Sequence, residues 1–188
     1  MIEVTGQGEG MKLRNGRGEV VPAALPPHLL STPLEYLYAD HLRQRGVCAV
    51  LRRLAAAGHV EEDEAKILAA FLERDMIIHH ADEEESLFPL LGKRCDHDDR
   101  LEADLSRLSL DHRKARPQLL RIADILLQAG GHISVTDASL FANFAAQEYR
   151  HLAFENGVIL PIARVRLTRK DIATLSRQMR ARRGIATP

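Results

Sequence analysis

Two stretches decide the fold of this chain, HHADEEESLFP at residues 79–89 and HLAFENGVILP at residues 151–161. Laid over each other, they share a histidine, a glutamate four positions later, and an apolar pair followed by proline. Every matching pair of positions lies 72 residues apart. Because repetition at a constant offset fixes the architecture of a chain, we interpret the sequence as two similar halves.

A second repeat precedes each of these stretches. The segment YADHLRQR carries His41 and the segment SLDHRKAR carries His112, and the two histidines lie 71 residues apart. Each histidine follows an aspartate and precedes a group of basic residues. Each half therefore contributes a DH segment and then an HxxxE segment.

The composition of the 188 residues excludes several classes of protein. Charged residues make up 28% and balance to a net charge of zero, so no bulk field attracts the chain to nucleic acid or membrane. The sequence has no apolar run near the roughly 18 residues of a membrane span, and its N-terminus lacks the apolar segment of a secretory signal. Two cysteines, Cys48 and Cys95, are too few for a disulfide framework. We therefore expect a cytoplasmic protein without nucleic-acid or membrane partners; protein partners are not predicted.

Local signals divide the chain into three parts. Residues 1–31 are rich in glycine, proline and charge, and we expect them to form an irregular arm. A helical bundle is expected over residues 32–165, followed by a short helix and basic tail over residues 166–188. Because no segment alternates with period two over a useful length, the predicted fold class is all-α.

The first two bundle helices have recognisable ends. Thr32 is the expected N-cap of the first helix, with Glu35 as its capping-box partner, and the helix is expected to run to Gly58. The second helix begins in the acidic segment VEEDEA, which suits the positive end of a helix, and ends at Gly92. Pro89 is expected to tighten or kink its last turn.

The remaining helices follow from the same signals. The third is expected to begin near residues 96–100, to be bent by Pro117 about one turn after His112, and to stop at a glycine pair, and the fourth begins near the segment SVTDAS. A shorter fifth helix has Thr168 as N-cap and Asp171 at the third position. Four long helices joined by short loops indicate an antiparallel four-helix bundle.

The repeated histidines and glutamates lie on the apolar faces of these helices. Residues four apart on a helix project from the same face, so each HxxxE motif presents a paired imidazole and carboxylate. The candidate metal ligands are therefore His41, His79, Glu83, His112, His151 and Glu155. An ionised carboxylate in a core costs several kcal/mol unless it is paired or binds a metal, and only Arg45 stands near these faces as a cationic partner. A bound cation is the simplest compensation.

Four imidazoles and two carboxylates suit two borderline divalent ions such as iron, with the carboxylates bridging them. Two histidines, both carboxylates and a bridging oxide or hydroxide give each metal five ligands and leave a sixth position open. The ferritin-like di-iron bundles instead use Glu-x-x-His motifs and additional glutamates. Neutral imidazoles leave more positive charge on the metals, which favours reversible binding or sensing over high-valent chemistry.

The pattern H…HxxxE…H…HxxxE, with LFP or ILP closing each second element, resembles the hemerythrin-like HHE cation-binding family. The resemblance covers roughly residues 33–165. It implies a four-helix bundle with a non-haem di-iron centre held by the six candidate ligands. The oxygen-carrying hemerythrins have an additional histidine on the third bundle helix, spaced four from another, and His112 has Leu108 and Arg116 at that spacing. The ligand set is more similar to that of bacterial iron–sulfur-cluster repair proteins, whose N-terminal cysteine segment has no counterpart in residues 1–30.

Several residues near the motifs have two interpretations. His80 and Glu84 repeat the four-residue spacing, but the 72-residue offset selects His79 as the ligand. Tyr38 either contacts a bound ligand or belongs to the core. Asp75 and Gln147, one turn before the HxxxE histidines, either orient the imidazoles or are polar boundary residues.

The other histidines, and Cys48, have plainer interpretations. Cys48 is interpreted as a buried filler. The histidines expected only to cap helices or meet solvent are His28, His59, His97 and His132. For the six candidate ligands themselves, a set of hydrogen-bonded core residues is the alternative, but it leaves the duplication unexplained.

Three classes of function are compatible with this site. The first is a protein whose di-iron centre binds or responds to O2, NO or peroxide, as a sensor, store or stress-response factor. The second is an enzyme or repair factor that removes peroxide or NO or supplies iron to damaged clusters. The third is a bundle in which the metal is mainly structural. We favour the first, because six ligands for two metals leave open coordination positions.

Overall fold

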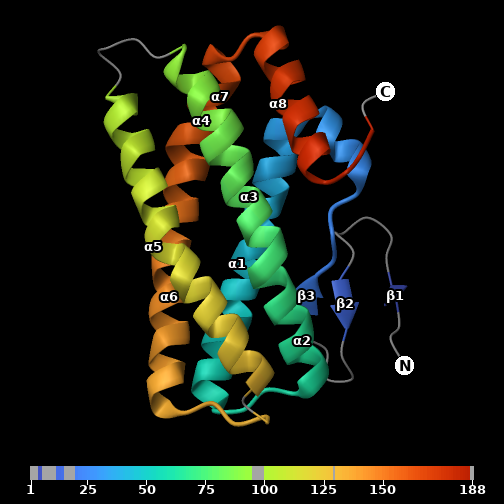
Figure 1. The fold of residues 1–188 in the computed structure, drawn as a ribbon, viewed down its shortest axis with the longest axis vertical. Coiled ribbons are helices and arrows are strands. Elements are labelled where there is room, and N and C mark those ends of the chain that lie inside the picture. The colour runs from blue at the N-terminus through green and yellow to red at the C-terminus, as the bar shows by residue number, and fades with distance from the viewer. Residues whose placement is uncertain (1–3, 6–11, 15–19, 95–99, 129, 187–188) are drawn as a thin grey trace.

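The computed structural model describes residues 4–5, 12–14, 20–94, 100–128 and 130–186. Long helices run side by side as a bundle, while a further helix and three short strands lie on its outside (Figure 1). The all-α helical bundle predicted from the sequence is confirmed. The helices are α1 (Pro33–Ala57), α2 (Glu62–Ala70), α3 (Met76–Asp82), α4 (Phe88–Gly92), α5 (Leu101–Gln128), α6 (Val135–Phe154), α7 (Leu160–Arg166) and α8 (Arg169–Arg182).

Two of the four bundle helices are composite. α2, α3 and α4 form one continuous helix, in which π-helical turns at Phe71–Asp75 and Glu83–Leu87 join the parts. α6 and α7 form another, joined by a π-helical turn at Glu155–Ile159. α1 and α5 complete the bundle, and α5 continues unbroken through Pro117.

The π-helical turns at Glu83–Leu87 and Glu155–Ile159 have a cause in the repeated motif. In each, the residue just before the closing proline donates its N–H to the carbonyl of the motif glutamate, five residues back. Pro89 and Pro161 follow, and a proline lacks an N–H and crowds the carbonyl four residues before it. The wider turn accommodates the proline, and turns of this kind are frequent at functional sites.

The helix ends agree with the sequence at two places and differ at a third. Thr168 and Asp171 form the predicted capping box, and Gly58 ends α1 with a φ of 66°. The capping box predicted at Thr32 is wrong. The Thr32 hydroxyl donates to the carbonyl of Leu29, because the chain enters α1 from a short 3-10 helix, Pro27–Ser31.

The N-terminal arm contains strands that the sequence did not predict. β1 (Val4–Thr5), β2 (Lys12–Arg14) and β3 (Val20–Pro22) pair antiparallel in the order β1-β2-β3. They are too short for a period-two pattern to show. Further along the arm, Leu30 is fully buried, and its carbonyl accepts a hydrogen bond from the Ser176 hydroxyl of α8 at 2.6 Å.

The apolar core consists of two clusters. One includes Leu51, Leu72, Ile122 and Phe144, and the other includes Leu37, Leu87, Leu108 and Ile159. Along every bundle helix, the repeated histidines fall between residues of one cluster and residues of the other. The polar site is therefore a layer enclosed between two apolar layers. Among the described residues, none of the helices combines the length and apolar character needed to cross a membrane.

Candidate metal centre

The six predicted ligand residues come together in the middle of the bundle. They form two groups, and within each group one ligand atom per residue lies within 4.8 Å of the others. Both groups contain Glu83 and Glu155, and all six residues are buried. The groups are His41, His79, Glu83 and Glu155, and Glu83, His112, His151 and Glu155. Two carboxylates thus stand between two pairs of imidazoles; we call this arrangement the six-residue cluster.

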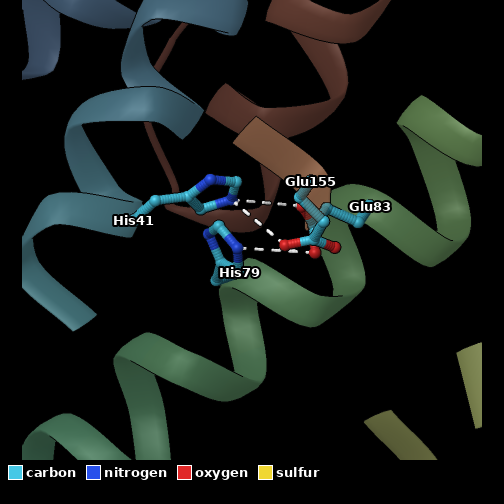
Figure 2. A group of neighbouring side chains, drawn as sticks. All are labelled: His41, His79, Glu83 and Glu155. Atoms are coloured by element: carbon cyan, nitrogen blue, oxygen red, sulfur yellow. Dashed lines mark hydrogen bonds and ion pairs between the residues drawn. The ribbon is translucent and has the colours of Figure 1, made fainter. Parts of the chain in front are cut away.

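In the first group, imidazole nitrogens face the carboxylates (Figure 2). Nε2 of His41 lies 3.4 Å from Oε1 of Glu83 and 3.5 Å from Oε2 of Glu155. Nε2 of His79 lies 3.4 Å from Oε2 of Glu83, one helical turn away in the chain. The HxxxE spacing therefore brings the pair to the same face of the helix, as expected.

The second group repeats this geometry. Nε2 of His151 lies 3.0 Å from Oε1 of Glu155, and Nε2 of His112 lies 3.4 Å from Oε2 of Glu83. The two Nε2 atoms of His112 and His151 are 2.8 Å apart. All four imidazoles of the six-residue cluster thus turn the same nitrogen, Nε2, toward the shared carboxylates.

In two of the histidines, the other ring nitrogen, Nδ1, donates a hydrogen bond to a residue in the opposite half of the chain. Nδ1 of His41 donates to Oδ1 of Asn156 at 2.7 Å, and Nδ1 of His112 donates to Oε1 of Glu84 at 3.0 Å. Asn156 and Glu84 each follow the motif glutamate of the other half. A proton held on Nδ1 leaves Nε2 with a free lone pair, which is the form that binds a metal.

The other two histidines have acidic partners within their own half. Oδ2 of Asp40 lies 3.0 Å from Nδ1 of His79, and Oδ2 of Asp111 lies 3.9 Å from Nδ1 of His151. Each aspartate is the first residue of a DH segment. The sequence did not predict these four partners of Nδ1, which are Asn156, Glu84, Asp40 and Asp111. The 72-residue offset between Glu84 and Asn156 could have indicated that these two have equivalent roles.

The donor atoms of the six-residue cluster fit a cation. Nε2 of His79, Oε2 of Glu83 and both carboxylate oxygens of Glu155 are buried without a hydrogen-bond partner among the described residues. A buried polar atom left unpaired costs roughly 1–3 kcal/mol, and more when it is charged. Inward lone pairs together with unpaired carboxylate oxygens make a donor set that positive charge would satisfy.

The charges of the metal-free cluster shift its pKa values. Burial alone would lower the pKa of His79, but Glu83 and Asp40 outweigh burial and raise it well above its usual value. Burial would raise the pKa of Glu83, yet His79 and the other imidazoles hold it well below the usual range. For His151, burial lowers the pKa, whereas Glu155 raises it, to about 9. Without a metal, imidazole protons supply the positive charge that the carboxylates require.

His80, the alternative to His79, lies outside both groups. Its ring stacks on that of His112, with centroids 4.0 Å apart and planes 12° apart. Burial, with His112 and His79 next, lowers the pKa of His80 well below its usual value. The geometry therefore agrees with the choice of His79 that the repeat offset made.

Two expected orienting residues are placed elsewhere. Asp75 accepts a hydrogen bond from Arg43 at 2.8 Å, and Gln147 is exposed. Of the two interpretations of Asp75 and Gln147, these positions fit that of polar boundary residues. Behind His79 lies the carboxylate of Asp40 instead. The buried Arg43 also donates to Asp40 at 2.6 Å, which places a cation behind the first group rather than inside it.

The other residues named from the sequence lie outside the six-residue cluster. Tyr38 is 41% exposed and does not belong to the core, whereas Cys48 is a buried free thiol whose pKa is raised by burial. His59 and His132 face each other across an isolated bridge between two loops. Arg45 stacks over the ring of Tyr149. Cys95 and His97 lie outside the described residues.

A groove of about 540 Å³ between α5 and α6 reaches only one side of the cluster. Its walls include His112 and His151 of the second group. The first group is sealed, with His41 at 0% and His79 at 1% exposure, whereas His151 is 9% exposed. The second group therefore has a route from solvent through this groove, whose lining includes neither His41 nor His79.

A helical bundle that encloses paired histidines and shared glutamates defines a class of cation-binding helical proteins. The model of the Hemerythrin HHE cation binding domain matches residues 32–163, which is most of the chain. The chain belongs to this family, as its sequence motifs indicated. No curated protein and no solved structure gives a significant match.

Proposed function

We propose that this chain holds a non-haem di-iron centre that binds or responds to a small ligand, O2, NO or peroxide. His41 and His79 would hold one iron, His112 and His151 would hold the other, and the two glutamates would bridge them. When bound, the iron pair supplies coordination sites and electrons. The protein would act as a sensor, store or stress-response factor.

The observation that carries this proposal is the convergence of four Nε2 atoms on two shared carboxylates. In His41 and His112 the opposite nitrogen is engaged by an acceptor, so the inward nitrogen is free to coordinate. Mixed imidazole and carboxylate ligands suit iron among the common divalent ions.

The groove at the second group favours ligand binding over a structural metal. A structural site is closed, whereas a site that exchanges ligands keeps a position open to its surroundings. His112 and His151 line the groove. A small molecule can therefore reach the second metal position without unfolding the bundle.

The test is anaerobic iron reconstitution followed by metal analysis. The wild-type chain should bind two iron ions and show a ligand-to-iron charge-transfer band in the near ultraviolet after oxidation. His79→Ala should abolish both, whereas His59→Ala, which alters an exposed loop histidine, should retain them. Equal loss of iron in the two variants would remove the basis of the assignment.

Titration of the reduced, loaded protein with O2, NO and peroxide then separates the functions. A saturable, reversible optical change with one of them supports binding or sensing. Sustained consumption of peroxide or NO by a catalytic amount of protein would support the enzyme alternative. No response to any of the three would leave a structural metal as the better interpretation.

A further inference from the structure

A third repeat lies in the loops at one end of the bundle. The triplet GHV at residues 58–60 follows α1, and the triplet GHI at residues 131–133 precedes α6, 73 residues further along the chain. Both loops lie at the end of the bundle opposite α8 (Figure 1). The triplets pair with each other as an antiparallel bridge, in which His59 stands directly opposite His132. Equivalent positions of the two halves therefore meet at this end of the bundle.

The glycine and the apolar residue of each triplet have structural roles. Gly58 and Gly131 have φ angles of 66° and 91°, which residues with a side chain rarely adopt. Val60 and Ile133 are buried, with exposures of 2% and 3%. The histidine between them is exposed in both triplets, so neither packing nor backbone conformation requires it. An exposed histidine at the same position of both halves points to a ligand that comes from solvent.

The backbone of the bridge brings the two imidazoles to the same side. Two backbone hydrogen bonds, each 2.9 Å long, join the residues that flank the histidines. His59 and His132 are therefore a non-hydrogen-bonded pair, the closer kind of antiparallel pair, with Cβ atoms expected about 4.5–5.5 Å apart. Because side chains of such a pair project from one face, both imidazoles can reach a single ion.

The surroundings of His59 add a third donor to this pair. Oε1 of Glu61 lies 3.3 Å from Nε2 of His59. The His59 ring lies against the backbone of Gly131, where a Cβ would stand 2.7 Å from its Cε1. The absence of a side chain at Gly131 therefore lets the imidazole lie next to the chain that carries His132.

The charge beside the pair favours a cation. A groove of about 390 Å³ is lined by His59 together with the carboxylates of Glu61 and Glu62, and Lys66 is the one cationic residue that lines it. Lys66 is paired with Glu62. A cleft with a surplus of one charge attracts ions of the opposite charge, so this groove raises the local concentration of cations.

We propose that His59, His132 and Glu61 form a surface site for a borderline divalent cation, with Zn²⁺ as the ion that fits best. Zinc takes two imidazoles and one carboxylate as ligands and completes its tetrahedron with water. The ion would join the α1–α2 loop to the α5–α6 loop and hold the equivalent ends of the two halves together. Fe²⁺ binds such ligands more weakly than Zn²⁺ does, so the iron content still reports on the buried six-residue cluster.

The first test is retention of the untagged, iron-loaded protein on a resin that carries immobilised Zn²⁺. The six-residue cluster is buried, so only surface histidines can meet a resin-bound ion. His59→Gln and His132→Gln should each elute at an imidazole concentration at least about threefold below that of wild type, because either change removes one of two joined ligands. His28→Gln, which removes a single exposed histidine, is the matched control and should elute as wild type does.

The second test is a Zn²⁺ titration of the iron-loaded protein in solution, in competition with a chromophoric chelator. Wild type should bind one Zn²⁺ in addition to its iron, and iron analysis afterwards verifies that no iron was replaced. His59→Gln and His132→Gln should each weaken this binding about tenfold or more, and Glu61→Gln should weaken it about threefold or more. The double histidine variant should be no weaker than either single variant, because one substitution already breaks the chelate.

The outcomes distinguish this site from the proposed function. Iron loading without an additional Zn²⁺, or Zn²⁺ binding that is unchanged in both single histidine variants, would overturn the surface site alone. Additive losses in the double variant would also overturn it, since they indicate two independent histidines. A chain that binds no iron but loses resin retention in both variants would leave the surface site standing. If one histidine variant is unfolded by circular dichroism, the other and Glu61→Gln decide: weaker Zn²⁺ binding supports the site, and wild-type affinity refutes it.

Discussion

Oδ2 of Asp40 lies 3.0 Å from Nδ1 of His79, although the two residues belong to different helices. Asp40 directly precedes His41, so the DH segment provides a ligand from one residue and support for another ligand from its neighbour. The second half repeats the relationship more loosely, with Asp111 3.9 Å from His151. The duplication thus includes the groups behind the ligands as well as the ligands.

Asp40→Asn should weaken iron binding about tenfold, because the carboxylate behind His79 raises the basicity of the coordinating nitrogen. Asp111→Asn should have a smaller effect, since its carboxylate is farther away and partly exposed. Competition with a chelator measures both affinities. Asp104→Asn, also an aspartate on α5 but outside the cluster, is the control. Equal affinities for Asp40→Asn and wild type would show that the aspartate only balances Arg43.

Asn156 and Glu84 lie behind His41 and His112, and each belongs to the other half of the chain from its histidine. We expect substitutions at these two positions to shift the midpoint potential of the iron in opposite directions. Asn156→Asp places a carboxylate behind His41, which makes the imidazole a stronger donor and should lower the midpoint potential. Glu84→Gln removes a carboxylate from behind His112 and should raise it. Potentiometric titration of the loaded protein measures the shifts, with the exposed Glu73→Gln as control. Shifts of the same sign in the two variants would contradict this account.

The fold and the cluster could be predicted because both depend on local periodicity. Residues four apart share a helix face, so the HxxxE spacing alone placed His79 beside Glu83. The constant offset between the halves then paired the first motif with the second. The short loops between the helices followed from glycine positions such as Gly58.

Other features depend on tertiary contacts that no local pattern contains. Thr32 has the sequence of an N-cap, yet its hydroxyl bonds to Leu29 because a 3-10 helix precedes α1. Asp75 has the position of an orienting residue, yet Arg43 from another helix engages it. The strands of the arm were missed because each has only two or three residues.

Arg183 and Asp82 provide a prediction about stability. Nη2 of Arg183 lies 2.7 Å from Oδ2 of Asp82, whose side chain is fully buried, and this pair fixes the end of α8 to α3. Arg183→Met should reduce the free energy of unfolding of the metal-free protein by about 3 kcal/mol, because Asp82 loses a partner inside the protein. Urea denaturation measures the change.

The exposed Arg177, which donates to Thr174 on the same helix, is the control for this substitution. Arg177→Met should change the free energy of unfolding by less than about 0.5 kcal/mol. Equal effects of the two substitutions would indicate that α8 contributes through its helical propensity and not through the buried ion pair. Arg182, which also reaches Asp82, limits the loss in Arg183→Met.

The pKa of His151 predicts how metal-free stability depends on pH. Its folded pKa of about 9 lies above the unfolded value of about 6.5. The protonated imidazole therefore stabilises the folded state fully below pH ~6.5, and this contribution is lost as the pH rises through about 9. The loss should be on the order of 3 kcal/mol, and His79, whose pKa is also raised, acts in the same direction.

Iron should reverse this dependence, because coordination requires the imidazoles to release the same protons. As the pH rises from ~6.5 to ~9, the metal-free protein should lose stability while the additional stability conferred by iron grows. Urea denaturation at a series of pH values, with and without iron, measures both trends. His151→Gln should make the metal-free curve shallower, with His79 responsible for the slope that remains, whereas His59→Gln should leave it unchanged. Metal-free stability that is constant over this pH range would show that His151 is neutral in the folded chain and that the carboxylates of the cluster are balanced by other charges.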